Sequence, residues 1–227
     1  MIELGPALAP EPAALVVAVI IDLIVGDPVY PVHPVRLIGR TLHWFEGWLR
    51  AVGFEGYGGG ILLFVLLAGL WLPVFAAIIA VALAISTTAA WLVHVLLVYS
   101  LLALGDLLHH VWRIESAVRR DSIEGARQAV SALVGRDTDR MDGAACRRAA
   151  VESLSENLTD GFVSPVFWYV IAGFPGLVLF KIVSTMDSMV GYKTPKYLRF
   201  GWCGARLDDA MNYVPARATW ILIAVVA

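Results

Sequence analysis

Residues 56–105, GYGGGILLFVLLAGLWLPVFAAIIAVALAISTTAAWLVHVLLVYSLLALG, form a stretch of fifty residues without Asp, Glu, Lys or Arg. As one helix this stretch would measure about 75 Å at ~1.5 Å per residue, more than twice the ~30 Å thickness of the hydrocarbon layer. We therefore predict two membrane-spanning helices joined by a tight turn at residues 86–88. His94 lies inside the second, where it is expected to hydrogen-bond to a neighbouring helix or, alternatively, to act as a buried functional imidazole.

The composition of the whole chain also indicates a membrane protein. Of its 227 residues, 59% are hydrophobic and 16% are charged, whereas soluble domains have an apolar share nearer half and a charged share nearer a quarter. The net charge of −2 and the absence of Lys/Arg blocks longer than two residues give no indication of a nucleic-acid partner. Cys146 and Cys203 have no His or Cys companion at zinc-ligand spacing.

A polar stretch, ESLSENLTDGFVSP at residues 152–165, separates two apolar parts of the chain. If one helix continues through it, Glu152, Glu156 and Asp160 lie four residues apart and share a face. Like charges stacked in this way call for a cation. Either neighbouring arginines or a divalent cation such as Mg²⁺, which suits oxygen ligands, would supply the charge. The nearest arginines are Arg147 and Arg148.

The N-terminal part holds a second group of polar residues. Residues 13–25 are apolar apart from Asp22, which is either solvated at the interface or part of a functional site. Three prolines within residues 26–36 predict a rigid extended loop that presents Asp27, His33 and Arg36 and could hold a phosphate or a metal ion. The apolar spacing of residues 37–50 predicts an amphipathic helix at the interface.

Further patterns concern the second half of the chain. Residues 106–160 combine helical apolar spacing with many charges. Ser164-Pro165 is typical of an N-cap followed by proline at the first helical position. The sequence Gly173-Phe174-Pro175-Gly176 interrupts the apolar run, which predicts two half-helices that are each too short to span. Asp208 and Asn212 stand four residues apart, as neighbours on a helix face.

The distribution of basic residues predicts the topology. Lys and Arg number none in residues 1–12, three in 26–60, eight in 106–164 and five in 184–217. Because the basic loops of a membrane protein lie on the cytoplasmic side, we expect the motif loops to be cytoplasmic and the N-terminus outside. Residues 165–189 must then form a re-entrant helix pair, which would mark a site.

These patterns predict an all-α, polytopic integral membrane protein with helical cytoplasmic segments, located in the cell membrane. We divide the chain into an N-terminal membrane region with an amphipathic loop helix (1–105) and a polar helical cytoplasmic region (106–164). Residues 165–227 comprise the re-entrant helices, a polar motif segment and the start of a further membrane helix.

Five groups of polar residues occur in a characteristic order. They are DLIVGDP and HPVR (22–28 and 33–36), LVGRDT (133–138), ESLSENLTDG (152–161), DSMVGY (187–192) and FGW, ARLDD and NYVPAR within 200–217. Together they resemble the adenosylcobinamide-phosphate synthase family, the CobD/CbiB proteins of cobalamin biosynthesis. The resemblance runs from about residue 15 to the C-terminus.

This resemblance implies a multi-pass membrane enzyme that joins aminopropanol, or its phosphate, to adenosylcobyric acid in an ATP-dependent amide synthesis. The corrin ring is then a substrate, and ATP and Mg²⁺ are required as co-substrate and cofactor. The sequence has no Gly-x-x-x-x-Gly-Lys-Ser/Thr phosphate loop, so ATP use is implied by the resemblance alone.

On this basis we assign three groups of candidate site residues. The candidate catalytic residues are Glu152, Glu156, Asp187 and His33. The candidates for substrate and phosphate binding are Arg36, Arg136, Asn157, Lys193, Arg199 and Arg206. The candidate metal ligands are Asp27, Asp160, Asp208 and Asp209. Carboxylates suit Mg²⁺, arginine and lysine neutralise phosphate charge, and histidine titrates near neutrality as a base requires.

The expected partners are the corrinoid substrate, aminopropanol phosphate and the lipid bilayer, with a homo-oligomer or other membrane enzymes of the corrinoid pathway as further candidates. Family members continue beyond the point where this chain stops, so the chain is either a natural short form or a fragment. The alternative to an enzyme is a non-catalytic membrane corrinoid carrier or an AmpE-like sensor, which would bind without consuming ATP.

Overall fold

The computed structural model describes residues 4–28, 30–132 and 137–226, and every regular element among them is a helix. The all-α prediction is therefore confirmed. In chain order the elements are α1 (Leu4–Leu8), α2 (Pro12–Val25), α3 (Pro34–Ala51), α4 (Tyr57–Ile85), α5 (Thr87–Tyr99), α6 (Leu104–Arg119), α7 (Ile123–Ser131), α8 (Gly143–Leu158), the π-helical turn η1 (Thr159–Val163), α9 (Ser164–Val190) and α10 (Trp202–Val226).

Several of these helices are long and apolar enough to cross a membrane. Among the described residues, three stretches qualify, Leu4–Val25, Tyr57–Ile85 and Gly143–Val190, and α5 with α6 would make a fourth across a bend of 40°. The predicted turn is confirmed, since α4 ends at Ile85 and the Ser86 hydroxyl caps α5 by accepting a hydrogen bond from the Ala89 amide. The second predicted span is shorter than expected because α5 ends after 13 residues, at Tyr99.

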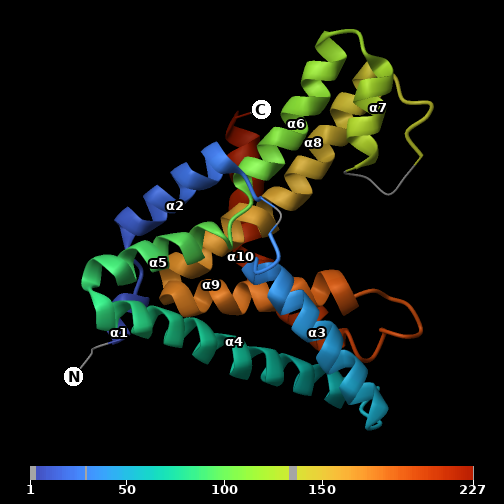
Figure 1. Ribbon diagram of the computed structural model, residues 1–227. Helices are drawn as coiled ribbons and strands as arrows, with labels where there is room; N and C mark the ends of the chain where they lie inside the picture. Colours follow the sequence, from blue (N-terminus) through green and yellow to red (C-terminus); the bar gives the residue numbers. More distant parts are fainter. Residues whose placement is uncertain (1–3, 29, 133–136, 227) are drawn as a thin grey trace.

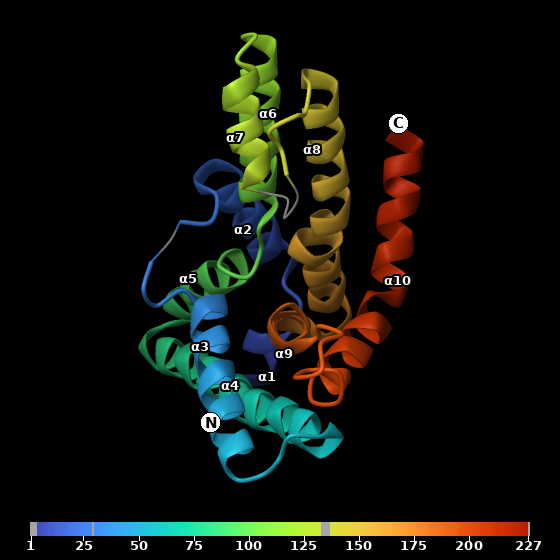
Figure 2. The same ribbon diagram turned by 90° about the vertical axis from the view of Figure 1, so that its right-hand side faces the viewer.

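The polar helices stand apart from the apolar ones. In both views α6, α7 and α8 lie together at one end of the molecule (Figure 1 and Figure 2). They share a small hydrophobic cluster of their own, formed by Ile114, Ala126, Val130, Cys146, Ala149 and Ala150. Arg147 of α8 forms an ion pair with Glu115 of α6 at 2.7 Å. Arg147 therefore balances the charge of Glu115 on α6 and not that of the acidic residues of its own helix.

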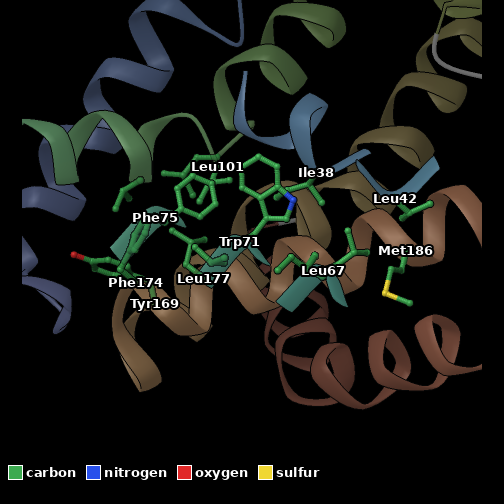
Figure 3. Close-up of a cluster of buried hydrophobic side chains, with 14 of the residues drawn as sticks. Ile38, Leu42, Leu67, Trp71, Phe75, Leu101, Tyr169, Phe174, Leu177 and Met186 are labelled. Atoms are coloured by element: carbon green, nitrogen blue, oxygen red, sulfur yellow. The ribbon is translucent and has the colours of Figure 1, made fainter. Parts of the chain in front are cut away.

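The main core lies where α3, α4 and α9 meet (Figure 3). One face of α3 is buried there through Ile38, Leu42 and Leu49, which confirms the amphipathic helix. The indole of Trp71 donates a hydrogen bond of 2.9 Å to the Thr41 hydroxyl, so the polar edge of this large core residue is satisfied. The core fixes α9, which carries polar side chains of the site.

Helix α9 is broken where the sequence predicts it. Gly173 has φ 66° and ψ −159°, a conformation that only glycine adopts readily. A side chain added at Gly176 would collide with the main-chain oxygen of Trp168, eight residues earlier, so the chain turns back on itself here. The two half-helices are confirmed, and their re-entrant position in a bilayer stays a prediction.

One local prediction, the N-cap at Ser164, is wrong. The segment after α8 is a π-helical turn, in which the amide of Ser164 donates to the oxygen of Thr159. Ser164 has helical backbone angles and does not cap a new helix, because the chain enters α9 without a break. Glu152 is exposed and Asp160 contacts α10, while the side chain of Glu156 lies outside the described residues, so the face shared by three carboxylates stays a prediction.

Candidate functional site

Asn212 of α10 joins the π turn to α9 and α10. Its amide nitrogen donates to the carboxylates of Asp160 and Asp208, at 2.9 Å each. Its amide oxygen accepts a hydrogen bond from the hydroxyl of Ser164, which is fully buried. One side chain thus orients two carboxylates, and the hydrogen bond from Ser164 fixes which end of the amide faces them.

Asp208 is the most perturbed acid in this group, and α10 is not among the candidate spans. Burial raises its pKa to about 6, and the neighbouring charge of Asp160 adds to the effect. Asp187 and Asp209 contribute in the same direction. Among the described residues, Oδ1 of Asp208 has no hydrogen-bond partner although it is buried. These four acids form the acid cluster, whose charge calls for a cation.

Lys181 supplies a buried positive charge beside the acid cluster. Its side chain, 9% exposed, donates to the main-chain oxygen of Asp160 at 3.3 Å. It also interacts electrostatically with Asp160, Asp27 and Asp22. Lys181 is not among the candidate site residues predicted from the sequence, because it lies between apolar residues of a predicted half-helix.

Asp22 connects the N-terminal region to the same place. It is fully buried, and its Oδ2 accepts a hydrogen bond of 3.0 Å from the amide of Gly105, at the start of α6. A side chain at position 105 would collide with the main-chain oxygen of Asp22, so glycine permits this approach. The Ala103 amide, two residues earlier, donates to the oxygen of Gly161 in η1. The segment 103–105 therefore links α2 to the π turn.

The loop between α2 and α3 contributes a histidine–carboxylate pair. Nε2 of His33 lies 2.7 Å from Oδ1 of Asp27, and the histidine side chain is 6% exposed. The hydroxyl of Tyr99 donates to the oxygen of Gly26 at 2.8 Å, which ties the beginning of the loop to α5. His94, in contrast, bonds to the Tyr169 hydroxyl and the Ala7 oxygen, which confirms its role as a link between helices.

Most predicted phosphate-binding residues lie outside the acid cluster. Arg36 lines an open pocket of about 570 Å³ with Arg40 and Met189. Arg199 lines another, of about 600 Å³, with Arg50 and Lys196.

The remaining candidates are more scattered. Lys193 is exposed, Arg206 bonds to Asp209 at 3.5 Å, and Asn157 bonds to Ser153. Arg136 and the side chain of Glu156 lie outside the described residues.

The acid cluster fits a metal ion that arrives with a substrate better than one held by protein alone. Among the residues that the structure describes, no group of three or more His, Cys, Asp or Glu is arranged to hold a metal ion. Magnesium bound with phosphates needs only one or two protein carboxylates. Asp160 and Asp208, held by one Asn212 amide, meet that need, and the unpartnered Oδ1 of Asp208 is available as a ligand.

Comparison with known proteins gives consistent results. The family described as CobD/Cbib protein matches residues 15–227. The cobalamin biosynthesis protein CobD of Rhizobium meliloti (strain 1021) is 40% identical over 224 residues, which cover 92% of this chain and 66% of that protein. The cobalamin biosynthesis protein CbiB of Salmonella typhimurium (strain LT2) is 36% identical, with 93% and 67% covered.

The chain thus spans about two thirds of the length of these relatives. No solved structure matches. The family match covers nearly the whole chain, including every described residue of the acid cluster, Lys181 and the His33–Asp27 pair. The chain therefore belongs to the CobD/CbiB family of cobalamin biosynthesis proteins.

Proposed function

We propose that this protein catalyses an ATP-dependent amide ligation that joins aminopropanol phosphate, or aminopropanol itself, to a carboxylate of adenosylcobyric acid. Membership of the family supports a role in cobalamin biosynthesis. The observation that carries the finer proposal is the pair of carboxylates in the acid cluster, Asp160 and Asp208, that Asn212 holds beside a buried lysine. Such a cluster suits a magnesium–nucleotide complex, because it offers carboxylate ligands that are already oriented.

The proposed chemistry has two steps. The substrate carboxylate attacks the γ-phosphorus of ATP, which gives an acyl phosphate and releases ADP. The amine then attacks the acyl carbon, inorganic phosphate leaves with the C–O bond electrons, and the nitrogen loses one proton to a base. Activation is needed because a carboxylate and an amine do not condense usefully in water.

Residues of this chain divide into candidate roles. Asp160 and Asp208 would hold Mg²⁺, which when bound offsets phosphate charge. His33 is the candidate base, and the carboxylate of Asp27 lies 2.7 Å from its Nε2, where it would stabilise the protonated ring. Asp187 adds negative charge near the metal position. The arginines that line the two open pockets are candidates for contacts with phosphate or with the side chains of the corrin.

The test is amide formation by the purified protein in detergent. The protein is supplied with adenosylcobyric acid, aminopropanol phosphate and Mg²⁺, with and without ATP, and products are identified by mass spectrometry. We expect product only with ATP, and at least a tenfold loss in Asp208→Asn. The exposed Asp139→Asn provides the matched control, with unchanged turnover. Corrinoid binding without any product would refute the ligase proposal and favour a carrier.

A further inference from the structure

Lys181 occupies an unusual place for a charged side chain. It lies in the second half of α9, a helix whose neighbouring residues Phe180 and Ile182 are fully buried in apolar surroundings. A buried ammonium group is stable only when negative charge and hydrogen-bond acceptors compensate for the water that it has lost. Its partners should therefore reveal what it does.

These partners come from two parts of the chain. The ammonium donates to the main-chain oxygen of Asp160, within the π turn. It also interacts electrostatically with Asp22 of α2 and with Asp27 of the loop that follows α2. Among the described residues, Oδ1 of the fully buried Asp22 has no hydrogen-bond partner. Its Oδ2 accepts a hydrogen bond from the Gly105 amide, and Lys181 is a cation in its surroundings that acts on it electrostatically without a direct bond.

The π turn is held by contacts from three parts of the chain. A π turn is a rare departure from the α-helical hydrogen-bond pattern that occurs frequently at functional sites. The Asp160 oxygen is held by Lys181, the Gly161 oxygen by the Ala103 amide, and the Asp160 carboxylate by Asn212. Of the donors in these three contacts, the ammonium group of Lys181 is the charged one.

We propose that Lys181 is a positioning residue that has two separable effects, fixing the π turn through the Asp160 oxygen and balancing the buried charge of Asp22. The first effect places the Asp160 carboxylate for the magnesium–nucleotide complex, so this part rests on the proposed function. The second concerns the stability of the fold and does not depend on any activity.

Four variants separate the two effects: Lys181→Met, Lys181→Arg, Asp22→Asn and the double variant Lys181→Met/Asp22→Asn. Loss of the buried cation and of its hydrogen bond to Asp160 should lower the unfolding midpoint of Lys181→Met by about 8 °C or more. The double variant should regain most of this loss, because neither charge is then left alone. Arg120→Met, which removes an exposed cation, should leave the midpoint unchanged.

Hydrogen–deuterium exchange measures the positioning effect. We expect faster exchange at residues 159–164 in Lys181→Met and also in the double variant, because removal of Asp22 does not restore the bond to Asp160. Lys181→Arg, which keeps the charge and the donors, should retain protection. In the amide assay, the Mg²⁺ concentration for half-maximal turnover should rise about tenfold in the two methionine variants and not in Lys181→Arg.

The outcomes are distinct. If residues 159–164 exchange at the wild-type rate in Lys181→Met, the positioning effect is overturned. If they exchange at the wild-type rate only in the double variant, Lys181 acts solely by balancing the charge of Asp22. If Lys181→Met does not fold, fast exchange in Lys181→Arg overturns the proposal instead. A wild-type protein that forms no amide would refute the proposed ligase activity, while midpoint and exchange would still decide the role of Lys181.

Discussion

Asn212 offers the sharpest test of the site, because one side chain holds three others. Replacement by leucine keeps the approximate volume and removes every hydrogen bond of the amide. The carboxylates of Asp160 and Asp208 each lose a donor at 2.9 Å, and the buried hydroxyl of Ser164 loses its acceptor. Asn212→Leu should therefore destabilise the junction of η1, α9 and α10.

The expected magnitude follows from these three bonds. A hydrogen bond to a charged group contributes about 1.5–3 kcal/mol and a neutral one about 1 kcal/mol, with the lower values applying here because Asn212 is half-buried. The sum is about 4 kcal/mol. For a chain of this size about 2–4 °C accompanies each kcal/mol, so the midpoint should fall by about 8–16 °C.

Thermal unfolding in detergent, followed by circular dichroism, measures this change. Tyr213→Phe is the matched control. Tyr213 follows Asn212 in the sequence and is 60% exposed, so its replacement should alter the midpoint by less than about 2 °C. Asn212→Asp sharpens the test, because it replaces a donor with a third carboxylate of the same shape. Addition of Mg²⁺ should raise the midpoint of Asn212→Asp more than that of the wild type.

Two results would refute the reasoning. A midpoint within about 2 °C of the wild type for Asn212→Leu would mean that the hydrogen bonds do not hold the carboxylates in place. An equal response of Asn212→Asp and the wild type to Mg²⁺ would mean that the acid cluster does not attract a divalent cation.

Three further predictions concern other parts of the molecule. The folded-state pKa of Asp208, about 6, lies above its ordinary value of 3.8, so the free energy of unfolding should fall as pH rises from about 4 to 6, by at most about 3 kcal/mol. A titration of the midpoint checks this, and Asp208→Asn should remove the contribution of Asp208 to the slope. Gly173→Ala should cost at least about 2 kcal/mol in unfolding measurements, because φ is +66° and a side chain would meet the Leu8 oxygen. Gly69→Ala, where nothing lies within 4 Å, is its control. A membrane-impermeant maleimide should label Ala9→Cys in intact cells and Thr194→Cys only after lysis, and the reverse pattern would overturn the predicted topology.

Features set by local sequence were predicted well. The length of an uncharged run determines whether it can span a membrane. Serine is a typical N-cap residue, and the Ser86 hydroxyl accepts a hydrogen bond from the Ala89 amide in the first turn of α5. The break at Gly173 follows from glycine and proline close together. None of these features depends on which other helix lies nearby.

Features created by tertiary contact were missed or misjudged. The π turn cannot be recognised from the spacing of Glu152 and Asp160, because both α- and π-helical hydrogen bonding fit the same residues. Lys181 looks like a single charge in an apolar helix until α9 folds back and brings it to the oxygen of Asp160. The sequence predicts Asn212 only as a neighbour of Asp208 on a helix face. Its contacts with Asp160 and Ser164 join α10 to η1 and α9, which the sequence does not reveal.

The π turn explains why these misses concern one place. Within this turn the Asp160 carboxylate accepts a hydrogen bond from Asn212, and its main-chain oxygen accepts one from Lys181. The Gly161 oxygen accepts a hydrogen bond from Ala103, and the segment 103–105 reaches Asp22 through the Gly105 amide. The acids of α2, η1 and α10 are therefore linked through the contacts of one turn, and perturbations at any of them should be felt at the others.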